Sequence, residues 1–271
     1  MLWLNGTLLD PSLARIDPTD RGFTLGDGVF ETIAVRAGIP RFLDRHLARL
    51  RDGAGVLGIG VPYGDDEIAA AITALLSARG LTGAALRITL SHGPGPRGLA
   101  PPDPARPTLM IAAAPLPPPP APARAVIART TCRNEHSPLS RIKSLNYLDN
   151  ILARREAAER GGDEAILLNT QGRVAEASIA NLFAVIAGVA VTPPVAEGVL
   201  PGIRRQTILA LGMAVERPLT VADLSGAEEI FLTSSLAIRP VAALDGVPVG
   251  DSAPGPITRA IIAAEAREDP V

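Results

Sequence analysis

The chain has 271 residues, 47% of them hydrophobic and 20% charged, which is ordinary for a globular protein and enough for one large domain or two smaller ones. A formal net charge of -2 provides no basic surface of the kind that binds nucleic acid. The single cysteine, Cys132, excludes an internal disulfide, and no leader or apolar run of about 18 residues is present, so we expect a cytoplasmic protein with no membrane partner.

The first third of the chain predicts two hairpins. The stretch "LWLNGTLLD" turns at Asn5-Gly6 between apolar runs, and "GVFETIAVRAGIPRF" turns at Ala37-Gly38. Two helices and then two strands are predicted after them, over residues 43–58, 65–80, 85–93 and 107–116. The Gly- and Pro-rich stretch "GPGPRGLAPPDPARP" between the two strands predicts a long surface loop.

A proline run, "PLPPPPAPA", occupies residues 115–123. Such a run favours polyproline II and cannot pair as a central strand. It predicts a linker between an N-terminal domain, residues 1–114, and a C-terminal domain, residues 124–271. The alternative is an exposed loop within a single domain.

The second half mixes strands and helices. Helices are predicted over residues 146–162, 200–212 and 255–269, and the first has Leu148, Ile151 and Leu152 at helical spacing. Short strands fill the remaining stretches, with a hairpin turn at Asp245-Gly246. Because the order shows no regular βαβ alternation, the fold class is predicted to be α+β.

Lys143, in "SRIKSLNYLDN", is the only lysine, and every other basic residue is arginine. A solvated positive charge can be either residue, but only lysine has an amine that can be deprotonated and form a Schiff base. The single lysine therefore indicates a position where the amine itself is needed. The alternative is an ordinary surface residue left over in an arginine-rich composition.

A Schiff-base lysine needs an electron sink, which is usually pyridoxal phosphate. That cofactor requires an acid beside its ring nitrogen, and helix-start N–H groups, hydroxyls and an arginine around its phosphate. The candidates are Glu176 in "GRVAEASIANLF", Ile203 and Arg204 in "LPGIRR", the "TSS" run that ends at Ser235, and Arg45 in "LDRHLARL". Taken singly, each is equally compatible with a solvated loop, a helix cap, a strand end or a helix surface. The three histidines and Cys132 lack metal-ligand spacing, so we expect no metal site.

Taken together, and in this order, these motifs resemble the fold-type IV pyridoxal-phosphate enzymes, from "LNGTLLD" through "GDGVFET" to "DGVPVG". The resemblance implies a smaller N-terminal α/β domain and a larger, mixed β-barrel-like C-terminal domain that binds the cofactor. It implies that Lys143 bonds to the cofactor aldehyde and later moves the Cα proton, and that Glu176 pairs with the ring nitrogen. It also implies that Arg45, Ser235 and the amides of Ile203 and Arg204 hold the phosphate. The family often has Thr where Arg204 stands, so only the backbone contact of Arg204 is carried over.

Two stretches bear on the reaction. Thr32 follows Phe30-Glu31, and aminodeoxychorismate lyases have a threonine there that assists proton transfer; Arg97 lies in "GPRGL", similar to their "GxRGY". The resemblance therefore favours a 4-amino-4-deoxychorismate lyase that releases pyruvate and forms 4-aminobenzoate, with Thr32 catalytic and with Phe30 and Arg97 binding the substrate. The alternative is a class IV aminotransferase acting on a D-amino acid, a branched-chain amino acid or an (R)-amine. A non-catalytic scaffold is a third possibility, which the retained Lys143 opposes. Family sites are completed by a neighbouring subunit, so we expect a homodimer with a small-molecule amino substrate.

Overall fold

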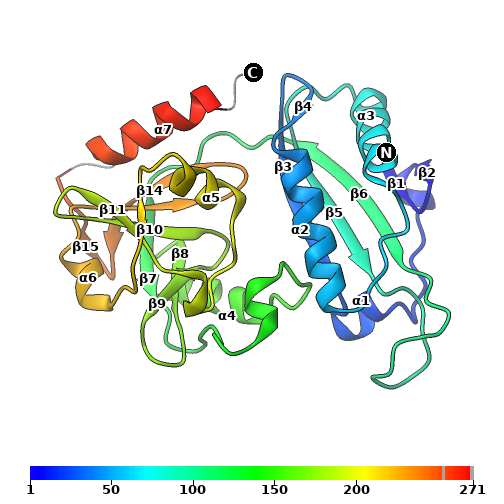
Figure 1. The fold of residues 1–271 in the computed structure, drawn as a ribbon, viewed down its shortest axis with the longest axis horizontal. Helices are drawn as coiled ribbons and strands as arrows, with labels where there is room; N and C mark the ends of the chain where they lie inside the picture. The colour runs from blue at the N-terminus through cyan, green and yellow to red at the C-terminus, as the bar shows by residue number, and fades with distance from the viewer. Residues whose placement is uncertain (252–253, 269–271) are drawn as a thin grey trace. The chain divides into compact units, whose positions relative to one another are not determined.

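The computed structural model describes residues 1–251 and 254–268, and the chain forms two compact units (Figure 1). The first unit consists of Met1–Pro117 together with Ile142–Asn146, and the second of Pro118–Arg141 together with the described residues from Tyr147 onward. Each unit has its own sheet and hydrophobic core. The mixture of helices and strands in both confirms the predicted α+β class.

The first unit is built on a six-stranded antiparallel sheet with the order β2-β1-β6-β5-β3-β4. Its strands are β1 (Leu2–Leu4), β2 (Thr7–Leu9), β3 (Gly28–Arg36), β4 (Ile39–Pro40), β5 (Ala84–Ser91) and β6 (Thr108–Pro115). Both predicted hairpins are confirmed. Their turns at Asn5-Gly6 and Ala37-Gly38 have positive φ at both residues, as a two-residue hairpin loop that matches the twist of the strands requires.

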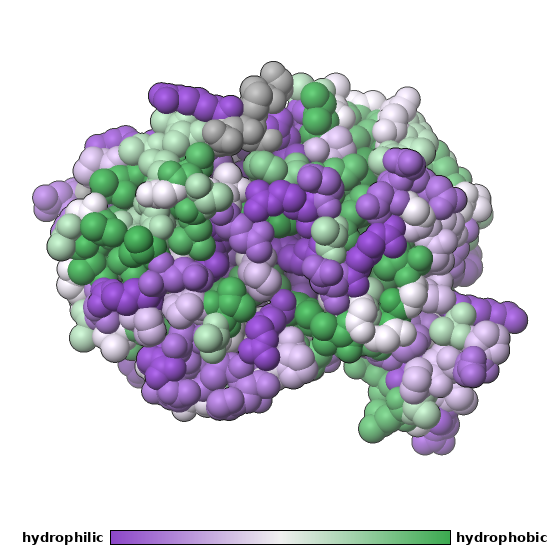
Figure 2. Space-filling model, in the orientation of Figure 1, coloured by the Kyte–Doolittle hydropathy of each residue, from purple (hydrophilic) through white to green (hydrophobic). Residues whose placement is uncertain are grey.

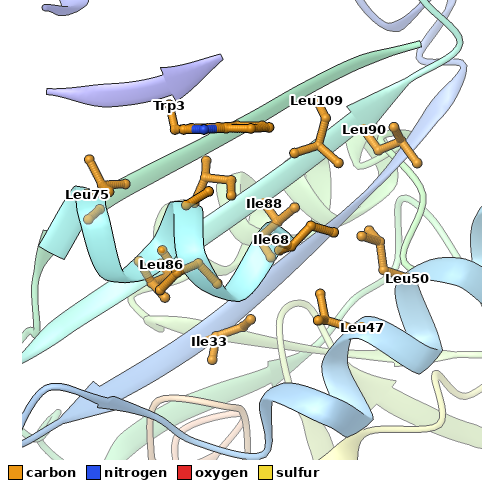
Figure 3. Packing of buried hydrophobic residues seen from close by; sticks show 14 of the residues in the cluster. Trp3, Ile33, Leu47, Leu50, Ile68, Leu75, Leu86, Ile88, Leu90 and Leu109 are labelled. Carbon is orange, nitrogen blue, oxygen red and sulfur yellow. The ribbon is translucent and has the colours of Figure 1, made fainter. Parts of the chain in front are cut away.

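Two helices, α2 (Leu43–Val56) and α3 (Asp65–Arg79), pack on one face of this sheet (Figure 3). Successive residues of a strand point to opposite faces, so alternate residues of β3 and β5, such as Ile33 and Leu86, enter the core with the helices. We call this the helix-packed face. The opposite, far face has Phe30 and Thr32 from β3 and the side chains opposite them in β5. The short helix α1 (Arg21–Leu25) was not predicted.

The stretch that contains the single lysine pairs with β3. The Phe30 N–H donates to the Lys143 carbonyl at 2.8 Å, and the Leu145 N–H donates to the Gly28 carbonyl at 2.9 Å. Ile142 enters the core of the first unit beside Val29. Residues 142–146 therefore belong to the first unit, whereas the division predicted from the proline run assigned them to residues 124–271. A local sequence pattern cannot show such a return, because its cause is backbone pairing over more than a hundred residues.

The second unit is built on a mixed, curled sheet with the order β12-β11-β10-β13-β14-β7-β8-β9, to which β15 adds beside β14. Its strands are β7 (Ala123–Ile127), β8 (Glu164–Leu168), β9 (Val174–Ala177), β10 (Asn181–Ile186), β11 (Val189–Thr192), β12 (Val215–Glu216), β13 (Glu229–Thr233), β14 (Ile238–Leu244) and β15 (Val247–Pro248). The pairs β7–β8, β7–β14 and β11–β12 are parallel. The contacts between β9 and β10 curl the sheet towards the predicted barrel-like shape.

Four helices accompany this sheet, namely α4 (Leu148–Glu159), α5 (Ile203–Ala210), α6 (Val221–Ser225) and α7 (Pro256–Glu268). The end of the predicted closing helix, residue 269, lies outside the described residues. In α4 the buried side is formed mainly by small and polar residues such as Ala153 and Ala157. The apolar residues at helical spacing, Leu148, Ile151 and Leu152, are exposed instead.

Figure 2 shows hydrophilic and hydrophobic side chains interspersed over the face that it presents. No helix among residues 1–251 and 254–268 is both long and apolar enough to cross a membrane. Within the same residues, histidine, cysteine and carboxylate side chains form no group of three that could hold a metal ion.

Candidate active site

The far face of the first sheet gathers two cationic side chains on one aromatic ring. The Lys143 amine nitrogen Nζ lies 4.2 Å from the centroid of the Phe30 ring. The guanidinium carbon Cζ of Arg87 lies 3.8 Å from the same centroid. Lys143 reaches this ring from the edge of β3, and Arg87 reaches it from β5. At such a place the amine can react with one group of a small molecule while the guanidinium binds its carboxylate.

Thr32 joins this group. It lies directly opposite Arg87 in the β3–β5 pairing, so the two side chains share the far face. The structure thus brings together three residues singled out in the sequence, Phe30, Thr32 and Lys143, and adds Arg87, which was not singled out. The sequence could have indicated Arg87, because both predicted strands alternate polar and apolar residues. Pairing the polar faces of the two strands would place Arg87 near Thr32.

Glu31 points to the helix-packed face and is fully buried. Its carboxylate oxygens accept hydrogen bonds from Arg49, at 2.8 Å from Nε and 2.7 Å from Nη2, and lie 2.7 Å from His46 Nδ1. Burial acts to raise the pKa of Glu31, but the hydrogen bonds and charges of His46 and Arg49 outweigh it and hold this pKa below its ordinary value. Burial lowers the pKa of His46, against the opposing effect of Glu31, and the charges of Arg49 and Lys143 lower it further.

Two other arginines singled out in the sequence also belong to the first unit. Arg45, on α2, has its guanidinium carbon 5.6 Å from the centroid of the Phe42 ring. Arg97 is exposed in the loop between β5 and β6. Neither is among the side chains that contact the Phe30 ring.

The loop around Arg97 is held by Arg21. The Arg21 guanidinium donates to the carbonyls of Gly98, Leu99 and Ala100 at 3.0–3.1 Å and to the Asp27 carboxylate at 2.7 Å. The hydrogen bonds from the buried Arg21 side chain therefore hold the backbone of this loop at residues 98–100.

In the second unit, Glu176 of β9 is buried. Its Oε1 lies 3.2 Å from Arg133 Nε. Its Oε2 accepts hydrogen bonds from the Leu200 N–H at 3.1 Å and from the Asn181 amide at 3.2 Å. Two hydrogen-bond donors and a guanidinium thus surround one buried carboxylate, which is the kind of group that can pair with a protonated ring nitrogen.

Helix α5 starts beside this carboxylate. Its N-cap is Gly202, and no side chain caps the first turn. Asn181 donates from its amide to the Leu200 carbonyl at 2.8 Å. A Cβ atom on Gly202 would lie 1.9 Å from Asn181 Oδ1, so only glycine allows the helix to begin so close to Asn181. The first-turn N–H groups of a helix attract anions, since they carry the positive end of its dipole.

Thr233, at the end of β13, lies directly opposite Asn181 in the β10–β13 pairing. Its side chain is 2% exposed, and no group of the described chain forms a hydrogen bond with its Oγ1 atom. Ser235, two residues later, is half-buried. An orphaned buried hydroxyl near a helix start is the donor that a phosphate oxygen would use.

The side chain of Arg204 extends away from the start of α5. Its Nε lies 2.5 Å from the Glu265 carboxylate of α7, and both side chains are largely buried. The neighbouring Arg205 pairs with Glu216 and donates to the Pro193 carbonyl. The guanidinium groups of both arginines thus contact other elements of the second unit.

These donors fit pyridoxal phosphate. The chemical groups that this cofactor requires are all present: the first unit has the amine of Lys143, and the second has the carboxylate of Glu176, the start of α5 and the hydroxyls of Thr233 and Ser235. The strongest observation for this fit is the Thr233 hydroxyl, which is buried without a hydrogen-bond partner among the described residues. Such a hydroxyl is rare in a packed core, and a bound phosphate oxygen would supply the missing partner.

Comparisons with known proteins agree. A family model, Amino-transferase class IV, matches residues 28–244. The D-alanine aminotransferase of Bacillus licheniformis is 31% identical over 261 residues, which are 94% of this chain and 92% of that enzyme. The solved branched-chain aminotransferase from Thermoproteus uzoniensis, with norvaline, has a TM-score of 0.89, is 32% identical and covers 98% of this chain and 93% of that one. The solved 4-amino-4-deoxychorismate lyase from Pseudomonas aeruginosa has a TM-score of 0.82, is 33% identical and covers 99% of both chains.

These matches extend over most of this chain and most of each relative. The family model covers the strands of both units from β3 to β14. Another similar branched-chain amino acid aminotransferase has been solved with pyridoxamine 5'-phosphate, the amino form of the expected cofactor. The chain therefore belongs to the class IV aminotransferase family, and it is a pyridoxal-phosphate-dependent enzyme with the fold type IV architecture.

Proposed function

We propose that the protein transfers the amino group of an amino acid to a 2-oxo acid. The observation that carries this proposal is the pair of Arg87 and Lys143 on the ring of Phe30. Amino acids and 2-oxo acids share a carboxylate beside the carbon that reacts. A guanidinium fork matches a carboxylate, and the amine at the same ring is placed for the reacting carbon.

In this reaction Arg87 binds the substrate carboxylate and orients the substrate. The Lys143 amine takes the proton from the α-carbon and returns it on the cofactor side, as a general base and acid. Phe30 supplies an apolar surface that excludes water beside the amine. The same residues serve both directions of the transfer.

The cofactor, when bound, supplies an electron-withdrawing ring that accepts the electron pair left by the departing proton. We propose that Glu176 keeps a proton on the ring nitrogen of the cofactor, and that Thr233, Ser235 and the first turn of α5 bind its phosphate. Asn181 contacts both Glu176 and the Leu200 carbonyl before α5, so it holds the acid and the helix start in register.

A second candidate is 4-amino-4-deoxychorismate lyase activity. The observation that favours it is Thr32, whose side chain shares the far face with Arg87. A hydroxyl there can hand a proton to a departing group, and the similarity to the lyase from Pseudomonas aeruginosa supports it. This substrate also has carboxylates that Arg87 would bind.

The two reactions are separated by their need for an acceptor. Purified holoenzyme is incubated with a panel of D-, L- and branched-chain amino acids, an (R)-amine and aminodeoxychorismate, each with and without a 2-oxo acid. An aminotransferase forms the new amino acid only when the 2-oxo acid is present. A lyase releases pyruvate from aminodeoxychorismate without it. Failure of every amino acid to donate its amino group would refute the primary proposal.

We also propose that the protein is a homodimer. Support comes from the exposed apolar side chains of α4, Leu148, Ile151 and Leu152, which would be covered in an oligomer. Light scattering on the holoenzyme tests this proposal, and a fully active monomer would contradict it.

A further inference from the structure

Thr89, in β5, carries a buried hydroxyl. Its Oγ1 atom is buried, and across residues 1–251 and 254–268 no group forms a hydrogen bond with it. Buried hydroxyls in folded proteins nearly always have a partner, because losing water without gaining a hydrogen bond is costly. When such a hydroxyl lies in a binding site, the missing partner is naturally an atom of the ligand.

The strand register places Thr89 within the candidate active site. Thr89 lies directly opposite Phe30 and two residues after Arg87. Side chains two residues apart in a strand point to the same face, so Thr89 and Arg87 are neighbours on the far face. The guanidinium carbon of Arg87 lies 3.8 Å from the centroid of the Phe30 ring. Because Phe30 is the residue directly opposite Thr89, this contact turns the guanidinium towards Thr89.

The chemistry of a carboxylate fits these two donors. A carboxylate accepts about four hydrogen bonds, more than one guanidinium fork supplies. A hydroxyl beside the fork adds a further donor from a second direction. We propose that Thr89 is a substrate-binding residue whose hydroxyl donates a hydrogen bond to the carboxylate that Arg87 binds. This proposal rests on the proposed function, since it needs a carboxylate-bearing substrate at Arg87.

The competing explanation is structural. Threonine is β-branched and suits a strand, and valine would then serve equally well. Thr89→Val keeps the shape and removes the hydroxyl, while Thr89→Ser keeps the hydroxyl and removes the methyl group. Thr7→Val is the matched control, because Thr7 is an exposed threonine in β2 of the same sheet.

The experiment uses holoenzyme of the wild type and the three variants. It measures KM and kcat for the best amino donor, and the Kd of propionate, an unreactive carboxylate, from the absorbance of the bound cofactor. In Thr89→Val both KM and the propionate Kd should rise about tenfold, as expected for one hydrogen bond to a charged group, with kcat changed less than about twofold. Thr89→Ser and Thr7→Val should stay within about twofold of the wild type.

The proposal is overturned if Thr89→Val binds propionate as the wild type does, or if Thr89→Ser is impaired as much as Thr89→Val. It is also overturned if the wild type does not bind propionate at millimolar concentration. Failure of the proposed function is a separate result. In that case the wild type transfers no amino group, while the propionate Kd still reports whether Thr89 contributes to carboxylate binding.

Discussion

Two faces of one sheet hold charged side chains in the first unit, and the partners of these side chains differ. On the helix-packed face, Arg49 and His46 contact the buried carboxylate of Glu31. On the far face, Arg87 and Lys143 contact the ring of Phe30. The two clusters are centred on Phe30 and Glu31, which are consecutive residues of β3. They lie on opposite faces because successive side chains of a strand point to opposite sides of the sheet.

The difference teaches what each group can do. A buried carboxylate holds its cations firmly, and breaking such a pair leaves an uncompensated charge. An aromatic ring attracts a cation more weakly, by about 0.5–2 kcal/mol. Cations that contact a ring are therefore more easily turned towards an anionic ligand. The comparison predicts that substitutions on the far face reduce activity, whereas those on the helix-packed face reduce stability.

The largest effect is expected for Lys143→Arg. Arginine keeps the positive charge but cannot bond to the cofactor aldehyde or take a proton, so activity should fall by at least about 10³-fold. The free energy of unfolding of the cofactor-free protein should change by less than about 1 kcal/mol. Steady-state turnover and urea denaturation measure the two quantities.

Borohydride reduction of the wild-type holoenzyme followed by peptide mapping is the matching control, because it should attach the cofactor to Lys143. A variant that keeps more than a tenth of the wild-type activity would mean that the far face does not carry the chemistry.

Glu31→Gln tests the other face. It leaves Arg49 beside an uncharged amide in a buried place, so the free energy of unfolding should fall by about 3–5 kcal/mol. Glu159→Gln is the matched control, because Glu159 pairs with Arg155 on an exposed surface of α4. Its effect should be below about 0.5 kcal/mol. Urea denaturation compares the three proteins, and equal effects of the two substitutions would break the comparison.

Arg87→Gln should reduce kcat/KM for the amino donor by about 10- to 100-fold, because a bidentate contact to a carboxylate is lost. Its effect on stability should be small, since Arg87 is an exposed residue of β5. Arg87→Lys keeps the charge but not the two parallel donors of the guanidinium, so its kcat/KM should lie between those of the wild type and Arg87→Gln. Steady-state kinetics with saturating cofactor measures this order, and a stability loss as large as that of Glu31→Gln would contradict it.

Much of the architecture could be predicted from the sequence, because it rests on local signals. The Asn5-Gly6 and Ala37-Gly38 turns specify their hairpins, and Gly80 specifies the end of α3. Lys143 was singled out because its chemistry cannot be supplied by arginine, and its role stays a proposal. The family matches confirm the predicted family and cofactor.

Other features depend on pairing between distant residues. Arg87 reaches the Phe30 ring only through the β3–β5 register, and Thr233 is placed beside Asn181 only through the β10–β13 register. The exposed face of α4 shows a second limit, since its apolar spacing predicts a helix without saying which side is buried. The role of Arg45 remains a proposal, and its guanidinium carbon lies 5.6 Å from the centroid of the Phe42 ring.

The smallest expected effect is a pH dependence that should differ between the two units. In the second unit, hydrogen bonds from Arg129, Thr130 and Arg160 outweigh burial and lower the pKa of Glu156 to about 2. Its folded pKa lies below the unfolded value of 4.5, so its contribution to stability is complete above pH 4.5 and is lost as the pH falls towards 2. In Glu156→Gln this part of the acid sensitivity should disappear.

His46 extends the acid sensitivity of the first unit to higher pH. Because its folded pKa lies below the unfolded value of 6.5, the unfolded chain binds more protons just below that pH, and stability should begin to fall there. Glu31, with a lowered pKa of its own, should add to the loss below pH 4.5. His46→Asn should remove the decline that begins near pH 6.5 and leave the one due to Glu156. Urea denaturation at several pH values between 2 and 8 measures the effect, and an unchanged profile in His46→Asn would show that the imidazole is not part of the network that stabilises this face.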